Sequence, residues 1–297
     1  WSEWVLSYAR KRLAPFYPEG PGGTPVGYFW AKTVPCGNPG CGIDVPLVSH
    51  RWLSRRSGKE PVAYRIEHAG DGTLTARILH GQAARDDDPA QGTMRRGSAR
   101  CPVCGSSLEP QEVKRAAREG RQRRWLYAVA EKGDNGMSFR AATEEDRKVF
   151  DAAREELDRR ITEHDDPFDA LVPDEPMPPR RAYGIYPQLY GVENWGQMFN
   201  PRQNLALVVF AEAVRAAHAA MRELTGDAER ARAVSLYLAL ELSRLTLRMS
   251  ESSVWHNAKR KVERATAGHR LPMVWDYVEA NPLGTISGSW QSNVSYG

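Results

Sequence analysis

The four cysteines of this 297-residue chain fall into two close pairs. Cys36 and Cys41 enclose Gly-Asn-Pro-Gly, whereas Cys101 and Cys104 enclose Pro-Val and precede a glycine. Each short turn can present two sulfur atoms to one ion, and two such turns complete the tetrahedral thiolate shell that zinc prefers. Because four thiolates leave no coordination position for water, the spacing predicts a structural zinc site rather than a catalytic one.

Two other uses of paired cysteines fit the sequence less well. Two disulfides would suit an exported protein, but the chain opens with Trp-Ser-Glu-Trp and has no apolar secretion signal there. A thioredoxin-like redox centre would use Cys101 and Cys104 but would leave Cys36 and Cys41 without a role. The long spacer between the pairs favours a zinc ribbon with a β-hairpin insertion.

A strongly basic segment surrounds the second cysteine pair. Residues 95–124 contain nine arginines and lysines against three glutamates, a net charge of +6 that exceeds the +4 of the whole chain. A cationic flank next to aromatic residues is typical of a surface that holds a nucleic-acid backbone, although a solvated helix face has the same composition. The candidate nucleic-acid contacts are Arg95, Arg96, Arg100, Lys114, Arg115, Arg118, Arg121, Arg123, Arg124 and Trp125.

Other catalytic patterns are absent from the sequence. The seven histidines show neither HxxxH nor HxH spacing, and neither GxGxxG nor GxxxxGK[ST] occurs. Asp276 and Glu279 lie three residues apart on an expected short helix and could form an acid pair, but a salt bridge or simple solvation explains them better. The residues alone therefore predict a zinc-bearing binding module with no catalytic residue.

Local patterns predict the elements that position these residues in the first half of the chain. Residues 2–13 form an amphipathic pattern that ends before Pro15, and residues 26–31 have the aromatic character of a strand. Two hairpins are expected, one joining 64–67 to 74–78 around Asp71-Gly72, and one joining 126–130 to 137–140. The acidic run at 86–89 is expected to be a solvated loop.

The second half of the chain is expected to be mainly helical. Thr143 and Asp146 form a capping-box pattern that begins a charged helix, and an acidic, Pro-rich linker follows over 164–182. Asn200-Pro201 predicts the start of a helix to about residue 224, and Asp227 that of another to about residue 250. A short helix is expected from 272 to 278. One face of the second long helix carries Val234, Leu238, Leu242 and Leu245.

These patterns together predict an α+β chain, with a β-rich zinc-ribbon insertion followed by a mainly α-helical part. Nine Trp, eleven Tyr and seven Phe exclude an intrinsically disordered protein. Apolar stretches such as 205–210 and 234–242 are interrupted by charges well before about 18 residues, so we expect no membrane span and a cytoplasmic location. The expected segments are an N-terminal helix and strand (1–32), the zinc ribbon with its hairpin insertion (33–142), a charged helix and linker (143–182) and a helical domain (183–297).

Blocks distributed in order over nearly the whole chain resemble one protein family. They are Tyr28–Cys36, Asn38–Cys41, Val45–Val48, Cys101–Gly105, Tyr183-Gly184, Trp195–Gln203, Leu271–Pro282 and Ser287–Trp290. These blocks are similar to those of the zinc-ribbon-containing adenine-specific DNA methylases of bacteria and archaea. The resemblance implies a Rossmann-like enzyme that transfers a methyl group from S-adenosylmethionine to adenine N6 of a flipped-out base, in restriction-modification or phage defence.

The motifs that would make this chain an active methylase by itself are not in the sequence. A glycine-bearing cofactor loop is absent, and Asn200-Pro201-Arg202 and Asn281-Pro282-Leu283 lack the second proline and the aromatic residue of an Asp/Asn-Pro-Pro-Tyr motif. The resemblance therefore implies an inactive central fragment that carries structural zinc and holds DNA. The methylase halves, in cis or in trans, would supply the S-adenosylmethionine site.

Two alternatives stay open at this point. The zinc ribbon could only buttress the methylase fold without touching DNA. The chain could also be a stand-alone zinc-ribbon adaptor that binds nucleic acid or a protein partner and has no enzymatic activity. Glycine-loop and Asp-Pro-Pro-Tyr motifs in the flanking reading frame would favour the methylase, and stop codons would favour the adaptor.

Overall fold

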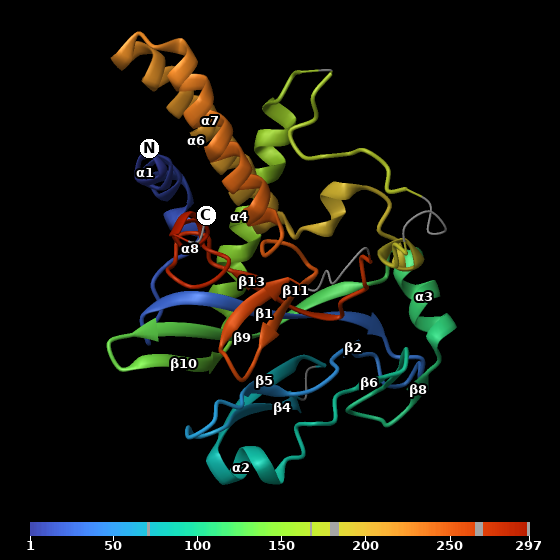
Figure 1. Ribbon diagram of the computed structural model, residues 1–297. Coiled ribbons are helices and arrows are strands. Elements are labelled where there is room, and N and C mark those ends of the chain that lie inside the picture. The colour runs from blue at the N-terminus through green and yellow to red at the C-terminus, as the bar shows by residue number, and fades with distance from the viewer. Residues whose placement is uncertain (70–71, 167, 179–183, 265–269, 296–297) are drawn as a thin grey trace.

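The computed structural model describes residues 1–69, 72–166, 168–178, 184–264 and 270–295 (Figure 1). Asp71 of the expected turn, residues 179–182 of the expected linker and Tyr183 lie outside these ranges. The helices are α1 (Ser2–Leu13), α2 (Gly81–Asp86), α3 (Pro110–Arg118), α4 (Glu144–Glu163), α6 (Pro201–Thr225), α7 (Ala228–Thr246) and α8 (Trp290–Ser295), with 3-10 helices at Ala14–Phe16, Pro187–Tyr190 and Trp195–Met198.

The strands are distributed over four antiparallel sheets, which confirms the α+β class. They are β1 (Thr24–Pro35), β2 (Asp44–Pro46), β3 (Trp52–Ser54), β4 (Val62–His68), β5 (Leu74–His80), β6 (Met94–Arg95), β7 (Ser98–Arg100), β8 (Ser107–Leu108), β9 (Arg123–Gly133), β10 (Gly136–Ala141), β11 (Ser253–His256), β12 (Lys261–Arg264) and β13 (Asp276–Ala280). Every strand ladder among the described residues is antiparallel.

The central sheet is built around β1, a long aromatic strand that is buried except at its ends. Its order is β10-β9-β1-β13, and β2 pairs with the end of β1. Irregularities in the β1–β9 register at Pro25/Gly27 and Phe29/Trp30 are typical of bulges, which bend a sheet. Because β1 runs across the expected boundary at 32/33 and pairs with residues 276–280, this sheet joins segments from both ends of the chain.

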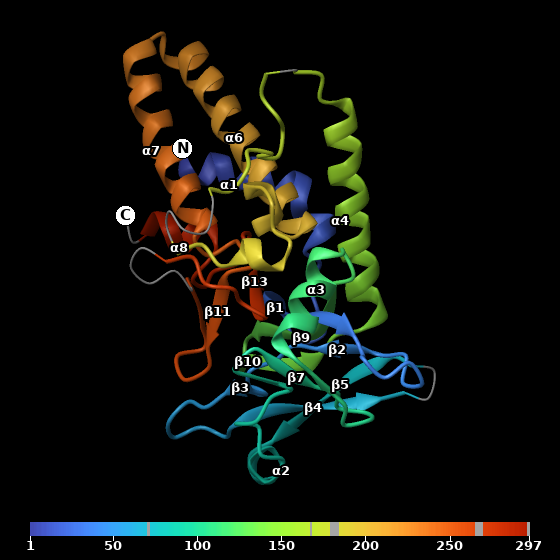
Figure 2. The same cartoon turned by 90° about the vertical axis from the view of Figure 1, so that its right-hand side faces the viewer.

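Helices cover one side of the central sheet, and the small β3-β4-β5 sheet with α2 lies on the other side (Figure 2). The largest core lies between these layers and includes Tyr28, Tyr64, Leu126, Phe210 and Trp290. This packing explains why β9 is buried along seven consecutive residues, since helices cover one of its faces and the small sheet covers the other.

Helix α6 begins where the sequence predicts. The Asn200 carboxamide accepts the Gln203 amide at 2.9 Å, the Gln203 side chain accepts the Asn200 amide at 2.9 Å, and Pro201 occupies the first turn. By length and hydropathy α6 is the one described helix that could cross a membrane. Half of its apolar window is buried in the molecule, as in a core helix, because α1, α4 and α7 pack around it.

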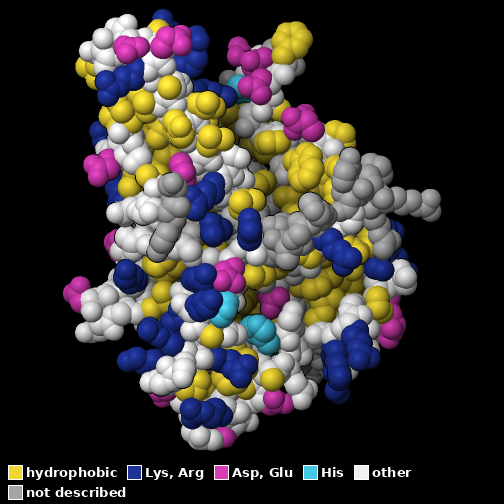
Figure 3. Space-filling model, in the orientation of Figure 1, with side chains coloured by type: hydrophobic (Ala, Val, Ile, Leu, Met, Phe, Trp, Pro, Cys, Tyr) yellow, Lys and Arg dark blue, Asp and Glu magenta, His cyan; other side chains and the backbone are white. Residues whose placement is uncertain are grey.

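The expected apolar face of α7 is confirmed. Leu238 and Leu245 are buried, and Val234 and Leu242 pack partly buried against the same core. Asp227 caps this helix through the Arg230 amide, also as expected. Hydrophobic side chains also gather on the outer surface of α7 in Figure 3. The largest exposed ones on this helix are Leu236, Tyr237 and Leu240.

The other local predictions are confirmed except in two segments. Helix α1, the β4–β5 and β9–β10 hairpins and the Thr143–Asp146 capping box of α4 form as expected. The helix expected over 272–278 is wrong, because residues 276–280 alternate between two faces and pair with β1. The acidic run at 86–89 is not simply solvated, since Asp87 pairs with Arg51 and Arg65.

Candidate metal centre

Each cysteine pair lies in the connection between two paired strands. Cys36 and Cys41 lie between β1 and β2, which pair through Pro35 and Asp44. Cys101 and Cys104 lie between β7 and β8, which pair through Arg100 and Ser107. Strands β3, β4 and β5 lie between the two turns in the sequence, so the arrangement agrees with a zinc ribbon that carries a hairpin insertion.

The two turns bring the four sulfur atoms together. Cys36 Sγ lies 3.6 Å from Cys104 Sγ, Cys41 Sγ lies 3.7 Å from Cys101 Sγ, and all four lie within 4.8 Å of one another. A tetrahedral zinc ion with bonds of about 2.3 Å to sulfur needs edges of about 3.8 Å between its ligands. No disulfide joins these cysteines. The cluster can therefore hold a metal ion such as zinc through the four predicted ligands.

Backbone hydrogen bonds shape both turns for this purpose. The Cys36 amide donates to Ile43 O at 2.8 Å, and the Cys41 amide donates to Asn38 O at 3.0 Å. In the second turn the Cys104 amide points at Cys101 Sγ at 3.4 Å, as in turns whose amides stabilise a bound thiolate. Gly105 has a φ of 75°, a left-handed conformation that favours glycine directly after the cysteine pair.

The electrostatic environment differs between the two turns. Hydrogen bonds from the Ser106 side chain and backbone lower the pKa of Cys104 to about 6, so this thiolate forms readily at neutral pH. Burial raises the pKa of Cys36 to about 12, and it also raises that of Cys41. Because zinc binds thiolates, metal must displace protons from the first turn, and we expect zinc affinity to rise with pH.

A small core of its own supports the metal centre, separate from the core beneath the central sheet. Helix α3 closes this core, starting from a capping box in which the Glu109 amide donates to Glu112 Oε2 at 2.8 Å. The buried side chains are those of Val34, Ile43, Val45, Leu47, Met94, Ala99, Cys101, Leu108, Val113 and Ala116. A core this small gives little stability by itself, which is the situation in which proteins use structural metals.

Most of the predicted nucleic-acid contacts lie at the surface near the metal centre. Helix α3, which carries several of them, packs against β1 and β7, the strands that lead into the two cysteine turns. A pocket of about 570 Å³ lies against the second turn and is lined by Arg51, Arg65, Arg100 and residues 101–105. The exposed members of the predicted set are Arg95, Arg96, Arg100, Arg115, Arg118, Arg121, Arg123 and Arg124, and Lys114 is half-buried.

The structure corrects one member of that set, Trp125, and pairs another, Arg124, with a carboxylate. Trp125 is 8% exposed and its indole donates to Leu74 O at 3.2 Å, so its ring is not available to stack on bases. The Arg124 guanidinium lies 2.5 Å from the buried carboxylate of Glu251. Both residues belong to β9, but only the Trp125 ring is buried by the packing of this strand. Arg124 keeps 37% of its side chain exposed while it pairs with Glu251.

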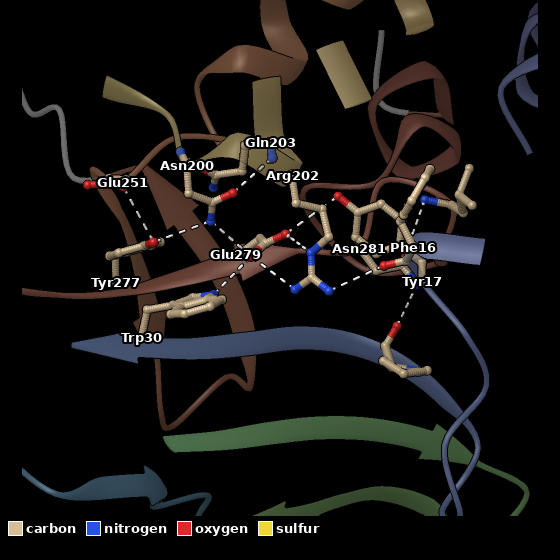
Figure 4. Close-up of polar contacts among 12 residues, drawn as sticks. Phe16, Tyr17, Trp30, Asn200, Arg202, Gln203, Glu251, Tyr277, Glu279 and Asn281 are labelled. Atoms are coloured by element: carbon tan, nitrogen blue, oxygen red, sulfur yellow. Dashed lines mark hydrogen bonds and ion pairs between the residues drawn. The ribbon is translucent and has the colours of Figure 1, made fainter. Parts of the chain in front are cut away.

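A buried polar network that the sequence did not indicate connects α6 to the central sheet (Figure 4). Arg202 and Glu279 are both fully buried, and their side chains pair at 2.6 Å between Nε and Oε1. Glu279 Oε2 also accepts Trp30 Nε1 at 2.8 Å and Asn200 Nδ2 at 2.9 Å. Burial alone would lower the pKa of Arg202, but the Glu279 charge raises it, so the guanidinium stays charged.

Tyr277 extends this network to a second buried carboxylate. Its hydroxyl accepts Asn200 Nδ2 at 3.2 Å and donates to Glu251 Oε1 at 3.5 Å. Lys32 Nζ lies 2.5 Å from the other oxygen of Glu251. Burial alone would raise the pKa of Glu251, but the charges of Arg124 and Lys32 lower it. Each buried carboxylate therefore has a cationic partner, as in a structural brace.

The expected acid pair is absent because β13 is a strand. Glu279 points into the buried network, whereas Asp276 accepts the Ser49 amide and hydroxyl at 3.2 Å each. Burial raises the pKa of Asp276. The one local signal for the network was a pair of polar residues, Arg202 and Gln203, in the first turn of an otherwise apolar helix.

Comparisons with protein-family models, with curated proteins and with solved structures find no match to this chain.

Proposed function

We propose that this chain is the central, DNA-holding part of a SAM-dependent adenine-N6 DNA methyltransferase. The observation that supports this proposal most is the tetrathiolate cluster beside an exposed cationic surface. A metal-braced turn is a rigid base, and rigid cationic surfaces suit recognition of a phosphate backbone. The blocks that resemble the zinc-ribbon methylases supply the enzymatic part of the proposal.

In this proposal the chain itself binds and positions DNA, and it carries no methyl-transfer chemistry. Cys36, Cys41, Cys101 and Cys104 hold zinc, which fixes the two turns relative to α3. The exposed arginines near these turns contact phosphates. The S-adenosylmethionine site and the pocket for the flipped adenine belong to Rossmann-like methylase halves, supplied in cis or in trans.

A groove between β9 and α4 is a second surface that suits a backbone. It has a volume of about 380 Å³, and its lining carries four arginines and one carboxylate, Asp151, with which Arg154 pairs at 3.0 Å. The four are Arg123, Arg124, Arg147 and Arg154. Arg123 belongs both to this groove and to the basic segment, so one continuous DNA strand could contact both surfaces. This surface would extend the contact beyond the zinc ribbon.

The test measures zinc content and DNA affinity on the same purified chain at two salt concentrations. We expect one zinc ion per chain, DNA binding that weakens with salt, and no methyl transfer by the isolated chain. Zinc without DNA binding would contradict the DNA-holding role and leave the ribbon as a buttress. Methyl incorporation by the chain alone would contradict its assignment as a non-catalytic part, and RNA or protein binding in place of DNA would favour the adaptor.

A further inference from the structure

A second cationic pocket lies away from the metal centre, where the end of α7 meets the β11–β12 hairpin and α8. It has a volume of about 930 Å³, in the range of small-molecule sites. Figure 3 shows Lys and Arg side chains gathered on this face, below α7 and around β11. Among the described residues its lining has no carboxylate and includes four cations, Arg244, Arg248, Arg260 and Lys261.

Two of these four cations are already paired. Arg244 lies 3.8 Å from Glu241, and Lys261 lies 2.8 Å from Glu263. Arg248 and Arg260 form no ion pair within the described part of the chain, although the Glu263 charge acts on Arg248 from farther away. Four cations against the two carboxylates Glu241 and Glu263 leave a net positive charge, and like charges that are not fully compensated repel one another. This imbalance points to a negatively charged ligand.

Arg248 carries a donor that the protein leaves unused. Its Nε is buried and has no hydrogen-bond partner among the described residues. Burial, together with the neighbouring charges of Arg244 and Arg264, lowers its pKa. A buried donor without a protein partner needs an ordered water or an ion to satisfy it, and an anion in the adjoining pocket would do so. The Cβ of Arg248 also lies near Gly288, so the base of this side chain is packed at the pocket wall.

Arg260 occupies a backbone conformation that disfavours a side chain. Its φ is 52°, in the left-handed region where glycine is preferred, at the turn between β11 and β12. The guanidinium is held by a 2.7 Å hydrogen bond from Nε to Ser54 Oγ. Among the described residues no side chain or carbonyl accepts from its terminal nitrogens, and its guanidinium carbon lies 5.8 Å from the centre of the Phe139 ring. Residues other than glycine that are held in this conformation cluster at functional sites.

We propose that this arginine pocket binds the phosphate group of an organic phosphate, with Arg248 and Arg260 as the phosphate ligands. Guanidinium groups match phosphate oxygens in a planar, two-pronged geometry, which a lysine cannot provide. The pocket is much larger than a phosphate ion, so the ligand carries the phosphate on a larger body. That body is a free nucleotide or a strand of nucleic acid. The pocket is independent of the function proposed for the zinc ribbon.

The experiment is calorimetric titration of the full chain with inorganic pyrophosphate, dATP and a single-stranded oligothymidylate. The variants are Arg248→Gln and Arg260→Gly, and the control is Arg232→Gln, an exposed arginine of α7 outside the pocket. We expect each pocket variant to weaken pyrophosphate binding by about tenfold, the loss of one charged hydrogen bond, and the control to leave it unchanged. Arg260→Gly also relieves the backbone, so its melting temperature should not fall far.

The outcomes separate the two sources of phosphate. A free nucleotide is indicated if dATP binding weakens in the variants while oligothymidylate binding does not. Nucleic acid is indicated if the oligothymidylate displaces pyrophosphate and loses affinity in both variants. Absence of pyrophosphate binding, or equal binding by the wild type and both variants, would overturn the proposal. A variant lacking Arg115, Arg121 and Arg123, tested alongside, reports on the zinc-ribbon surface and distinguishes failure of one proposal from failure of the other.

Discussion

Arg202 shows how a single side chain can join distant parts of this chain. It extends from the first turn of α6, donates to Glu279 of β13 and to Phe16 O at 3.2 Å, and lies 3.9 Å above the Tyr28 ring. A buried charge is tolerated only with a partner, because removal of either member leaves the other in a low-dielectric interior. The Arg202–Glu279 pair therefore fixes the position of α6 on the central sheet.

Glu279→Gln is expected to lower the free energy of unfolding by about 3–5 kcal/mol, since it leaves the Arg202 charge buried without a counter-ion. Urea denaturation of the two proteins measures this difference. The matched control is Arg123→Gln, because Arg123 and its partner Asp44 are exposed and lie 3.8 Å apart. The control should lose less than about 1 kcal/mol. Equal losses of unfolding free energy in both variants would show that the buried pair contributes no more to stability than the exposed one.

Cys101→Ser is expected to abolish zinc binding, because it removes one of four ligands and a buried one. Metal binding contributes about 10 kcal/mol or more to the folding of small zinc modules, so the core around α3 should unfold. The central sheet should persist, since β1 and β9 are also buried in the larger core. Metal analysis and hydrogen exchange test both parts. Val103→Ser, in the same turn but exposed, should keep its zinc.

At the scale of elements, the predictions that succeeded rest on neighbours in the sequence. The Asn200–Gln203 capping box and the β9–β10 hairpin are specified by a few adjacent residues, so each could be expected from its own segment. The cysteine cluster was predictable for a related reason, since spacing within each pair restricts its ligand geometry. Strand β13 could not be predicted from its own segment, because only five residues form it and its partner β1 lies near the other end of the chain.

The cap of α4 offers a pH-dependent test at this scale. Burial alone would raise the pKa of Asp146, but Arg140 and the Thr143 backbone and hydroxyl lower it. A carboxylate whose folded pKa lies below its unfolded value adds stability above the unfolded pKa and loses it as the pH falls through the folded pKa. Asp146→Asn should thus cost about 1–2 kcal/mol at neutral pH.

That cost should begin to shrink as the pH falls below the unfolded-state pKa of about 4, and it should disappear as the pH falls through the lower folded pKa, where the wild-type carboxylate becomes protonated. Thermal unfolding of both proteins from neutral to acidic pH measures it. Asp158→Asn, on the exposed side of the same helix, should change stability by less than about 0.5 kcal/mol throughout. A cost for Asp146→Asn that is independent of pH would show that the ion pair with Arg140 contributes nothing.

At the scale of the whole molecule, the charge is distributed in separate regions rather than spread evenly. Cations gather around the cysteine turns and again at the arginine pocket, although the net charge is only +4. Sequence counting located the first region but included Trp125, because the burial of this ring depends on what β9 packs against. The second region was not predicted, since its four cations come from two segments, 244–248 and 260–261, that only the fold brings together.

Replacing Arg115, Arg121 and Arg123 with Ala is expected to reduce the slope of log affinity for DNA against log salt by about two to three, because each phosphate contact contributes about 0.9. Arg124 is left in place because it pairs with Glu251. Fluorescence anisotropy over a salt series measures the slope. A control with Arg230 and Arg232 replaced, on the exposed side of α7, should keep it. An unchanged slope in the first variant would remove this surface from the DNA interface.

The pairing of β1 with β13 has a consequence for synthesis of the protein. Ribosomes add about 5–20 residues per second, so β1 emerges roughly tens of seconds before its partner strand. Until then one edge of this aromatic strand has no neighbour, and Arg202 has no counter-ion. The nascent chain therefore contains an incomplete sheet with an unpaired edge, which is prone to aggregate. We expect the yield of folded protein to depend on chaperone capacity, even if the completed protein is stable.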